Sequence, residues 1–179
     1  MTFREIYRKY IKRDGADKFL EWLESTDFFT APASTKFHDA YEGGLAEHSA
    51  NTFYELDRIL QAYPELSPSK ETVAIVSLLH DVCKADCYKV EYRNRKNDYG
   101  QWEKYPVYIF KEDFCFGGHG SKSVYLIQKY MPLTEEEATA INCHMGVENG
   151  NWAVNDAFRA YPLAFLLHTA DMASTINFN

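Results

Sequence analysis

The sequence predicts an all-α helical bundle that carries one β-hairpin insertion, and two observations lead to this fold class. Apolar residues recur at the three- and four-residue spacing of amphipathic helices over most of the 179 residues. The pattern changes only at residues 88–110, where aromatic and β-branched residues flank a polar turn at residues 97–100, as expected of a β-hairpin. We find no internal repeat and no low-complexity tract.

The part of the chain before the hairpin predicts four helices. Apolar spacing places two short helices at residues 3–11 and 19–23, on either side of Gly15. Beyond Gly43 and Gly44, a longer helix is expected to run to about residue 63, where Pro64 ends it. Residues 69–85 predict a mostly buried helix, because their apolar side chains leave little polar surface.

The part of the chain after the hairpin predicts three more helices. The first is expected at residues 121–131. The second begins at Thr134, which forms a capping-box pattern with Glu137, and runs to His144. The last follows Pro162.

Length and composition favour a single domain spanning residues 1–179, because 46% hydrophobic content is enough for one sizeable core. The apolar runs are far shorter than the roughly 20 residues of a membrane-spanning helix. The N-terminal residues lack the apolar stretch of a signal peptide. The four cysteines, at positions 83, 87, 115 and 143, form no CxxC pair and suit a reducing compartment. We therefore expect a cytoplasmic protein with no membrane partner.

The net charge of −7 limits the partners that the chain can bind. Nucleic-acid wrapping depends on clustered Lys and Arg, so no stable binding of duplex nucleic acid is expected. A small phosphorylated substrate is compatible with this charge, because acidic side chains that ligate a metal are neutralised by it.

The residues that carry the chemistry are imidazoles and carboxylates in predicted helices or at their ends. All six histidines lie at predicted helix ends or inside apolar segments. The ordered set of candidate ligands is His48, His80, Asp81, His119, His144 and Asp171. Imidazole and carboxylate groups suit Fe, Mn, Zn or Co, and six of them can serve two ions. Adjacent residues on a helix point about 100° apart, so His80 and Asp81 need partners from other helices to bind one ion.

Three segments of the chain resemble the HD superfamily of metal-dependent phosphohydrolases. They are Gly-Gly-Leu-Ala-Glu-His-Ser at residues 43–49, Leu-Leu-His-Asp-Val-Cys-Lys at 78–84 and His-Thr-Ala-Asp at 168–171. Residues 37–45 are also similar to the HD domains of certain 3′-to-5′ exoribonucleases. Residues 118–120 and 143–146 look like the two additional histidine positions of binuclear members. The Gly-Tyr-Pro signature of the cyclic-dinucleotide phosphodiesterase branch is absent.

The resemblance implies an HD-domain helical bundle over about residues 36–175, with the hairpin at 88–110 as an insertion. It implies one or two divalent ions, of Fe, Mn, Co, Ni or Zn. The implied primary metal ligands are His48, His80, Asp81 and Asp171, and His119 and His144 are candidates for a second ion. The implied reaction is attack of metal-activated water on phosphorus. The expected catalytic residues are Asp81, Lys84, His119 and His144, with Lys84 near the phosphate.

Some of these residues have alternative interpretations. His119 and His144 are either ligands of a second ion or helix-cap and phosphate contacts. Lys84 is either a partner of the phosphate or an ordinary solvated lysine. His38 is a further candidate for the site. His168 is expected to orient a ligand rather than to bind the metal itself.

The hairpin contains five basic and three acidic residues in an otherwise acidic protein. The residues expected to bind substrate are Lys84, Arg93, Arg95 and Lys122. The hairpin aromatics either stack on a base or pack across the strands; they are Tyr88, Tyr92, Tyr99, Trp102 and Tyr105.

The function expected from these observations is hydrolysis of a phosphoester in a nucleotide or short oligonucleotide. Two other classes stay open. One is a di-iron oxygenase of the HD group, since its ligand set is similar. The other is a non-catalytic nucleotide-binding HD module. The sequence assigns no oligomeric state.

Overall fold

The computed structural model describes residues 1–36, 38–111, 117–147 and 153–176. It is mostly helical with one two-stranded antiparallel hairpin, which confirms the predicted combination of helices and hairpin. The elements are α1 (Phe3–Tyr10), α2 (Ala16–Ser25), α3 (Gly44–Leu60), α4 (Lys70–Leu79), η1 (Val82–Lys84), β1 (Tyr88–Lys96), β2 (Trp102–Phe110), α5 (His119–Gln128), α6 (Glu135–Cys143), α7 (Ala153–Ala160) and α8 (Pro162–Ser174). Within the described ranges, no helix is long and apolar enough to cross a membrane.

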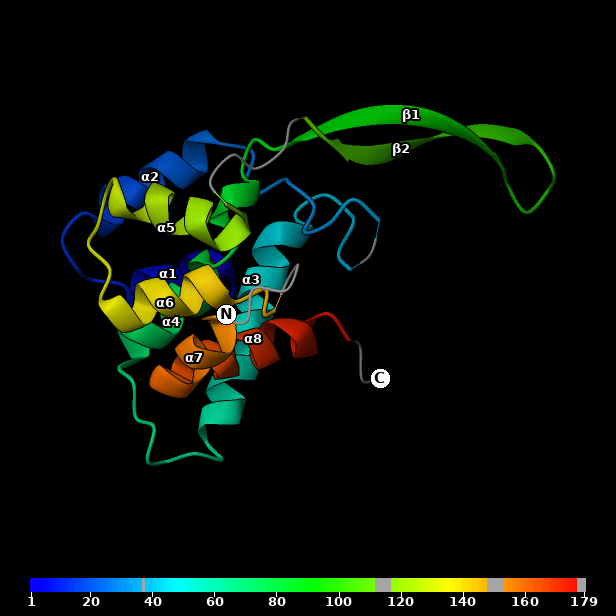
Figure 1. Cartoon of the computed structure of the whole chain (residues 1–179). Helices are drawn as coiled ribbons and strands as arrows, with labels where there is room; N and C mark the ends of the chain where they lie inside the picture. Colours follow the sequence, from blue (N-terminus) through cyan, green and yellow to red (C-terminus); the bar gives the residue numbers. More distant parts are fainter. Residues whose placement is uncertain (37, 112–116, 148–152, 177–179) are drawn as a thin grey trace.

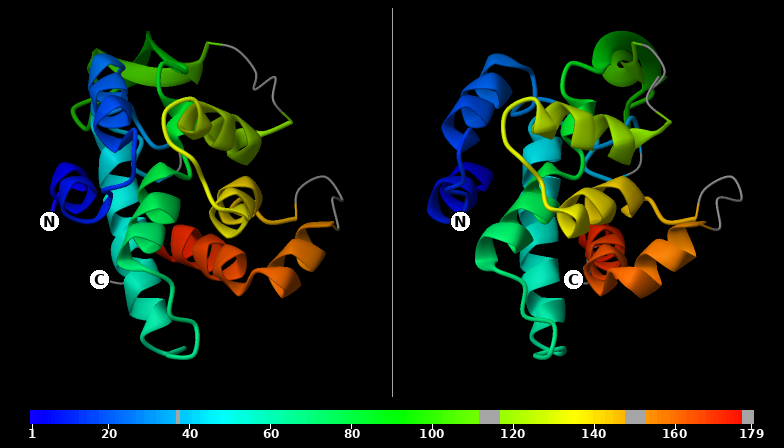
Figure 2. Two further views of the ribbon diagram at one scale, coloured as in Figure 1. Left: turned by 90° about the vertical axis from the view of Figure 1, so that its left-hand side faces the viewer. Right: turned by 60° about the vertical axis from the view of Figure 1, so that its left-hand side comes forward.

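The core is arranged around α4. All residues from Val73 to Leu79 are buried, and α4 contacts α1, α3, α6 and α8. Helix α3 lies along both α4 and α8, and α6 lies along α5 and α8, as Figure 2 shows. Burying one Leu or Ile side chain stabilises the fold by roughly 1.5–3 kcal/mol. The buried side chains of this central helix therefore hold the ends of the neighbouring helices in fixed positions. The candidate ligands lie at those ends.

The helix predicted at residues 69–85 ends earlier than expected. Helix α4 stops at Leu79, and His80 is its C-cap. Asp81 then has φ −110° and ψ 17°, outside the helical region, and the short 3₁₀ turn η1 follows. This break turns the Asp81 carboxylate toward the Lys84 ammonium, which lies 2.7 Å away. The predicted helix is therefore too long at its C-terminal end, because Asp81 lies outside it.

A second difference is α7, which the sequence analysis did not predict. It spans only eight residues, and Val154 is its only residue classed as buried among those described. Eight residues are fewer than the roughly 11 to 18 over which helical apolar spacing is recognised in a sequence. The capping box that begins α6 is confirmed, because the Thr134 hydroxyl accepts from the Glu137 N–H and the Glu137 carboxylate accepts from the Thr134 N–H.

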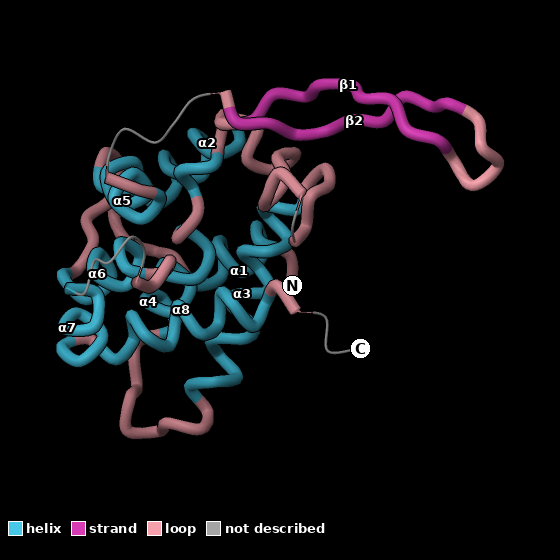
Figure 3. The backbone as a smooth tube through the Cα atoms, turned by 45° about the vertical axis from the view of Figure 1, so that its right-hand side comes forward, coloured by secondary structure: helices cyan, strands magenta, loops and turns pink. Residues whose placement is uncertain are grey.

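The predicted hairpin is confirmed, with a register that runs from Tyr88 opposite Phe110 to Lys96 opposite Trp102. Its turn is closed by hydrogen bonds from the Asn97 N–H to the Gln101 carbonyl and from the Gly100 N–H to the Asn97 carbonyl, both 2.9 Å. Gly100 has φ +76°, which glycine adopts readily. Figures 1 and 3 show that the hairpin projects from the helical body.

Candidate metal centre

Five candidate ligands come together where four helices pack. His48 lies on α3, His80 and Asp81 follow α4, His144 caps α6, and Asp171 lies on α8. The three imidazoles are fully buried, and the two carboxylate residues are 2% and 9% exposed. Burying this many ionisable groups is costly unless they are compensated. The buried carboxylates of the cluster therefore need a positively charged partner.

The distances within the cluster are those of ligands around an ion. The Nε2 atoms of His48 and His80 are 3.3 Å apart. The Asp171 Oδ1 atom is 3.0 Å from His48 Nε2 and 3.7 Å from His80 Nε2. Asp81 Oδ2 lies 3.5 Å from His80 Nε2. Two donors that are each about 2.1 Å from one ion lie about 3.0–3.5 Å from each other. Small movements would thus place these atoms around one ion.

The hydrogen bonds of the three imidazoles direct Nε2 into the cluster. The Nδ1 atoms of His80 and His144 donate to the carbonyls of Ser77, at 2.8 Å, and Ile141, at 2.7 Å. A carbonyl can only accept, so each Nδ1 carries a proton. His48 Nδ1 lies 3.2 Å from the Ser174 hydroxyl, which donates to the Asp171 carbonyl and can therefore accept from His48. Histidine ligands of metals are usually anchored in this way.

A proton and a divalent cation compete for the same position beside His80. Burial opposes the charged imidazolium, but the carboxylates of Asp81 and Asp171 outweigh it and raise the pKa of His80 to about 10. The pKa of Asp171 is lowered, because hydrogen bonds from His48 and His80 outweigh its burial. The site thus has a strong electrostatic preference for positive charge.

Two buried atoms of the cluster lack a hydrogen-bond partner among the described residues. They are Asp81 Oδ1 and His144 Nε2, which lie 3.5 Å apart. An unsatisfied buried polar atom costs about 1–3 kcal/mol. A cation between the two atoms would satisfy both, so the residues present fit a metal ion.

Lys84 is a buried member of the cluster, and the alternative of an ordinary solvated lysine is wrong. It is 8% exposed. Its ammonium group donates to Asp81 Oδ2, at 2.7 Å, and to the Ala33 carbonyl, at 2.8 Å. The pKa of Lys84 is raised, because Asp81 outweighs the effect of burial, and Lys84 and His80 in turn hold the pKa of Asp81 well below its usual range.

His119 lies at the edge of the cluster, at the start of α5. Its Nδ1 atom is 3.9 Å from Cys83 Sγ. Ligand atoms of Asp81, Cys83 and His119 lie within 4.8 Å of one another, and so do those of His48, His80 and Asp81, and those of His80, His144 and Asp171. Asp81 therefore lies between two groups of donors and can bridge two ions. Cys83 is a donor that was not among the six candidate ligands predicted from the sequence.

Three further residues surround the cluster. The His38 ring lies 4.9 Å from the His48 ring, and its Nε2 atom is buried without a hydrogen-bond partner in the described part of the chain. Asp39 Oδ2 is 3.9 Å from His48 Nδ1. His168 Nδ1 donates to the His144 carbonyl, at 2.6 Å. His168 therefore supports the backbone of a ligand.

The predicted substrate-binding residues lie in three places. Lys84 is in the cluster, and Lys122 is on α5, with its Nζ 3.5 Å from Cys87 Sγ. Arg93 and Arg95 are exposed on β1 of the projecting hairpin. Arg95 pairs with Glu103 at 2.7 Å. Within the described part of the chain, Lys84 pairs directly with a candidate ligand, Asp81.

A cavity of about 530 Å³ lies beside His119, between the start of α5 and helices α6 and α7. Its walls include Gly118, Asn142 and Gly146. Small-molecule sites commonly have volumes of about 300–1,000 Å³. This cavity is therefore large enough for a small substrate.

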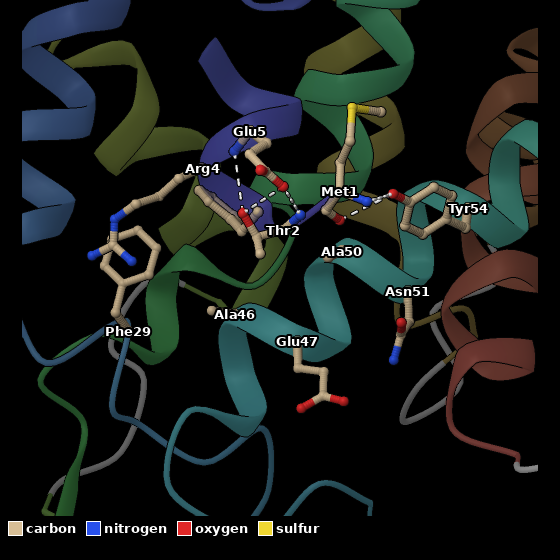
Figure 4. Close-up of a pocket in the computed structure, with 11 residues that line it drawn as sticks. Met1, Thr2, Arg4, Glu5, Phe29, Ala46, Glu47, Ala50, Asn51 and Tyr54 are labelled. Atoms are coloured by element: carbon tan, nitrogen blue, oxygen red, sulfur yellow. Dashed lines mark hydrogen bonds between the residues drawn. The ribbon is translucent and has the colours of Figure 1, made fainter. Parts of the chain in front are cut away.

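Another cavity, of about 500 Å³, lies between the N-terminal residues and α3 and contains none of the six candidate ligands. Figure 4 shows the Tyr54 hydroxyl paired with Met1, and the Arg4 guanidinium stacked on the Phe29 ring, 3.5 Å from its centroid. This cavity is thus separate from the candidate metal centre.

Comparison of the chain with protein-family models, with curated proteins and with solved structures finds no match.

Proposed function

We propose that the chain is a metal-dependent phosphohydrolase of the HD superfamily that hydrolyses a phosphoester in a nucleotide or short oligonucleotide. One observation carries this proposal. A buried cluster of three imidazoles and two carboxylates brings its donor atoms together in overlapping groups of three, and two of those atoms have no partner among the described residues. The resemblance of the segments around His48, His80 and Asp171 to HD phosphohydrolases adds the reaction class.

The proposed ligands of the first ion are His48, His80, Asp81 and Asp171. His119 and His144, with Asp81 as the bridging carboxylate, would hold a second ion. Oxygen and nitrogen donors of this kind suit Fe, Mn, Co, Ni or Zn. When bound, such ions lower the pKa of water and so supply a nucleophile near neutral pH.

Lys84 is the residue proposed to stabilise charge on the phosphoryl group. An ammonium group has three N–H donors, and two of those of Lys84 go to Asp81 and the Ala33 carbonyl. Among the described residues, the third N–H has no acceptor, so it can donate to a phosphate oxygen of the substrate. A fixed donor in a buried site stabilises developing negative charge more strongly than a solvated one.

In the form of the site with one ion, where His119 binds no metal, His119 is the residue proposed to protonate the leaving oxygen. It lines the cavity of about 530 Å³, and its ligand atom lies within 4.8 Å of those of Asp81 and Cys83. His144, the other candidate, is fully buried. His119 therefore has better access to a leaving group that extends into the cavity.

The experiment is a hydrolysis assay of the purified chain with nucleoside monophosphates, short oligonucleotides and bis(p-nitrophenyl) phosphate. We expect turnover with Mn, Fe, Co, Ni or Zn that a chelator abolishes and Asp81→Ala lacks. Asp57→Ala is the matched control, since Asp57 pairs with Lys70 on the surface. Equal hydrolysis by the Asp81→Ala variant would exclude this site.

A di-iron oxygenase is the second candidate function. The position of Asp81 between two donor groups favours it, because a bridging carboxylate with histidine ligands also suits two irons. Iron that stays bound, with consumption of O₂ and without phosphoester hydrolysis, would identify this class. Bound metal with neither reaction would identify a non-catalytic nucleotide-binding module.

A further inference from the structure

The two faces of the β-hairpin differ in composition. Residues opposite each other in the register share a face, and successive residues alternate between faces. The even-numbered face consists of Tyr88, Val90, Tyr92, Asn94, Lys96, Trp102, Lys104, Pro106, Tyr108 and Phe110. We call these ten residues the aromatic face. The remaining strand residues, all odd-numbered, form the opposite face.

The charges of the hairpin are separated between these faces. Both acidic residues of the strands, Glu91 and Glu103, are on the opposite face. They pair there with Lys89, at 3.4 Å, and with Arg95, at 2.7 Å. The aromatic face carries two lysines and no carboxylate. It is therefore purely cationic in a chain with a net charge of −7.

Cross-strand packing explains only part of the aromatic face. At its base, the Tyr88 ring packs on Phe110, with centroids 4.9 Å apart. Farther out, Tyr92 is 69% and Trp102 is 71% exposed. Exposed apolar patches that are rimmed by polar residues mark interaction sites on protein surfaces.

We infer that the aromatic face binds single-stranded nucleic acid, with bases stacked on Tyr92 and Trp102 and phosphates near Lys96 and Lys104. Aromatic rings combined with cationic side chains are the usual platform for unpaired bases. In a duplex the bases are already stacked, and the acidic body repels a second polyanionic strand. A second copy of the chain is a poorer occupant, because two such faces would bring lysines against lysines.

The aromatic face leads to the candidate metal centre. Its first residue, Tyr88, donates from its hydroxyl to the Ala33 carbonyl, at 3.3 Å. The same carbonyl accepts from the Lys84 ammonium. A strand held on the hairpin would thus have one end close to Lys84. Binding of single strands to the hairpin does not depend on the proposed function. The claim that single-stranded oligonucleotides are the substrate class rests on the proposed function.

The test is a fluorescence-anisotropy titration of a labelled oligothymidylate with the full chain at low salt, with the probe checked for cleavage by electrophoresis. Trp102→Ala and Tyr92→Ala should each weaken binding by roughly fivefold to a hundredfold, the range for loss of one stacked base. Replacing both Lys96 and Lys104 with Ala should reduce the slope of log affinity against log salt by about 1.4. A duplex probe should bind more weakly than the single strand.

The matched controls are Lys89→Ala and Tyr105→Ala, which change the same residue types on the opposite face. They should bind the probe like the wild type. Equal loss in the controls, or unchanged binding in Trp102→Ala and Tyr92→Ala, would overturn the inference. The inference would also be overturned if the wild type were a dimer and the Trp102→Ala substitution dissociated it without changing its affinity for the probe.

The two proposals fail in different ways. No probe binding by a chain that hydrolyses nucleotides would overturn the inference about the hairpin and leave the proposed function intact. Binding on the aromatic face by a chain that hydrolyses no phosphoester would support the inference and contradict the proposed function.

Discussion

Lys84 and Asp81 form the contact that links the candidate ligands to the proposed chemistry. Both are buried, and their charged groups lie 2.7 Å apart. Removing one member of a buried ion pair leaves an uncompensated charge. The pair therefore has a structural role and a proposed catalytic role, which require separate measurements.

Lys84→Met should lower both stability and turnover. The loss of the buried pair should reduce the free energy of unfolding by about 3–5 kcal/mol in the absence of metal. With saturating metal, turnover should fall on the order of 10²- to 10³-fold, as on removal of one donor to a developing charge. Urea unfolding and the hydrolysis assay measure the two effects. Lys70→Met is the control, because Lys70 forms a surface pair; full turnover by Lys84→Met would disprove its catalytic role.

The stability of the metal-free chain should fall as pH rises above about 6.5 toward about 10, the pKa of His80 in the folded protein. The folded state holds this proton more tightly than the unfolded state, so its stabilising effect is complete below the unfolded pKa and is lost through the folded one. Urea unfolding in a chelator at several pH values measures this slope. His80→Gln should reduce the slope, and saturating metal should do the same because it displaces the proton. If the free energy of unfolding of the wild type stayed constant or rose with pH over this range, the claim that His80 is protonated in the folded protein would be contradicted.

At the scale of elements, close packing of α5 against α6 places His119 beside the cluster. A Cβ atom at Gly120 would lie 2.4 Å from the Asn142 carbonyl oxygen and 2.5 Å from that of Ile141. Glycine at this position therefore sets the distance between the two helices. Among the described residues, α5 carries His119 and α6 ends at His144.

Gly120→Ala should move α5 away from α6 and weaken the second metal site while the first is kept. Overpacking of this kind costs about 1–3 kcal/mol. If the wild type binds two ions, a metal titration of Gly120→Ala should show one binding step instead of two. The Tm of this variant should also be lower. Gly100→Ala is the control for backbone strain alone, because Gly100 has φ +76° in the hairpin turn and open space around it, so alanine there strains the backbone without overpacking two helices. Normal packing and unchanged metal binding in Gly120→Ala would show that this contact does not position His119.

The elements differ in how far the sequence could predict them. Apolar periodicity and the Thr134 capping box predicted α6, and the turn at Asn97 predicted the hairpin. The early end of α4 was missed, because the residues after Leu79 remain buried like those of the helix while the backbone turns at Asp81 to reach Lys84. Helix α7 was missed because its eight residues are too few to establish a helical period in the sequence.

At the scale of the whole molecule, ordered motifs predicted the candidate ligands, and the fold determines which partners surround them. Five ligands from separated segments are brought together by the packing of α3, α4, α6 and α8. The sequence could not indicate that Ser174 orients His48, that the Ala33 carbonyl holds Lys84, or that Cys83 faces His119. These contacts join residues far apart in the chain, and each uses a residue type that is common in structural roles.

The metal content of the chain, purified without chelators and measured by elemental analysis, tests the central claim most directly. We predict one or two ions per wild-type chain, none in Asp81→Ala and the wild-type content in Asp57→Ala. With two ions in the wild type, His144→Ala should keep one. Absence of metal from the wild type, even after incubation with Mn, Fe, Co, Ni or Zn, or full metal content in Asp81→Ala, would contradict the account.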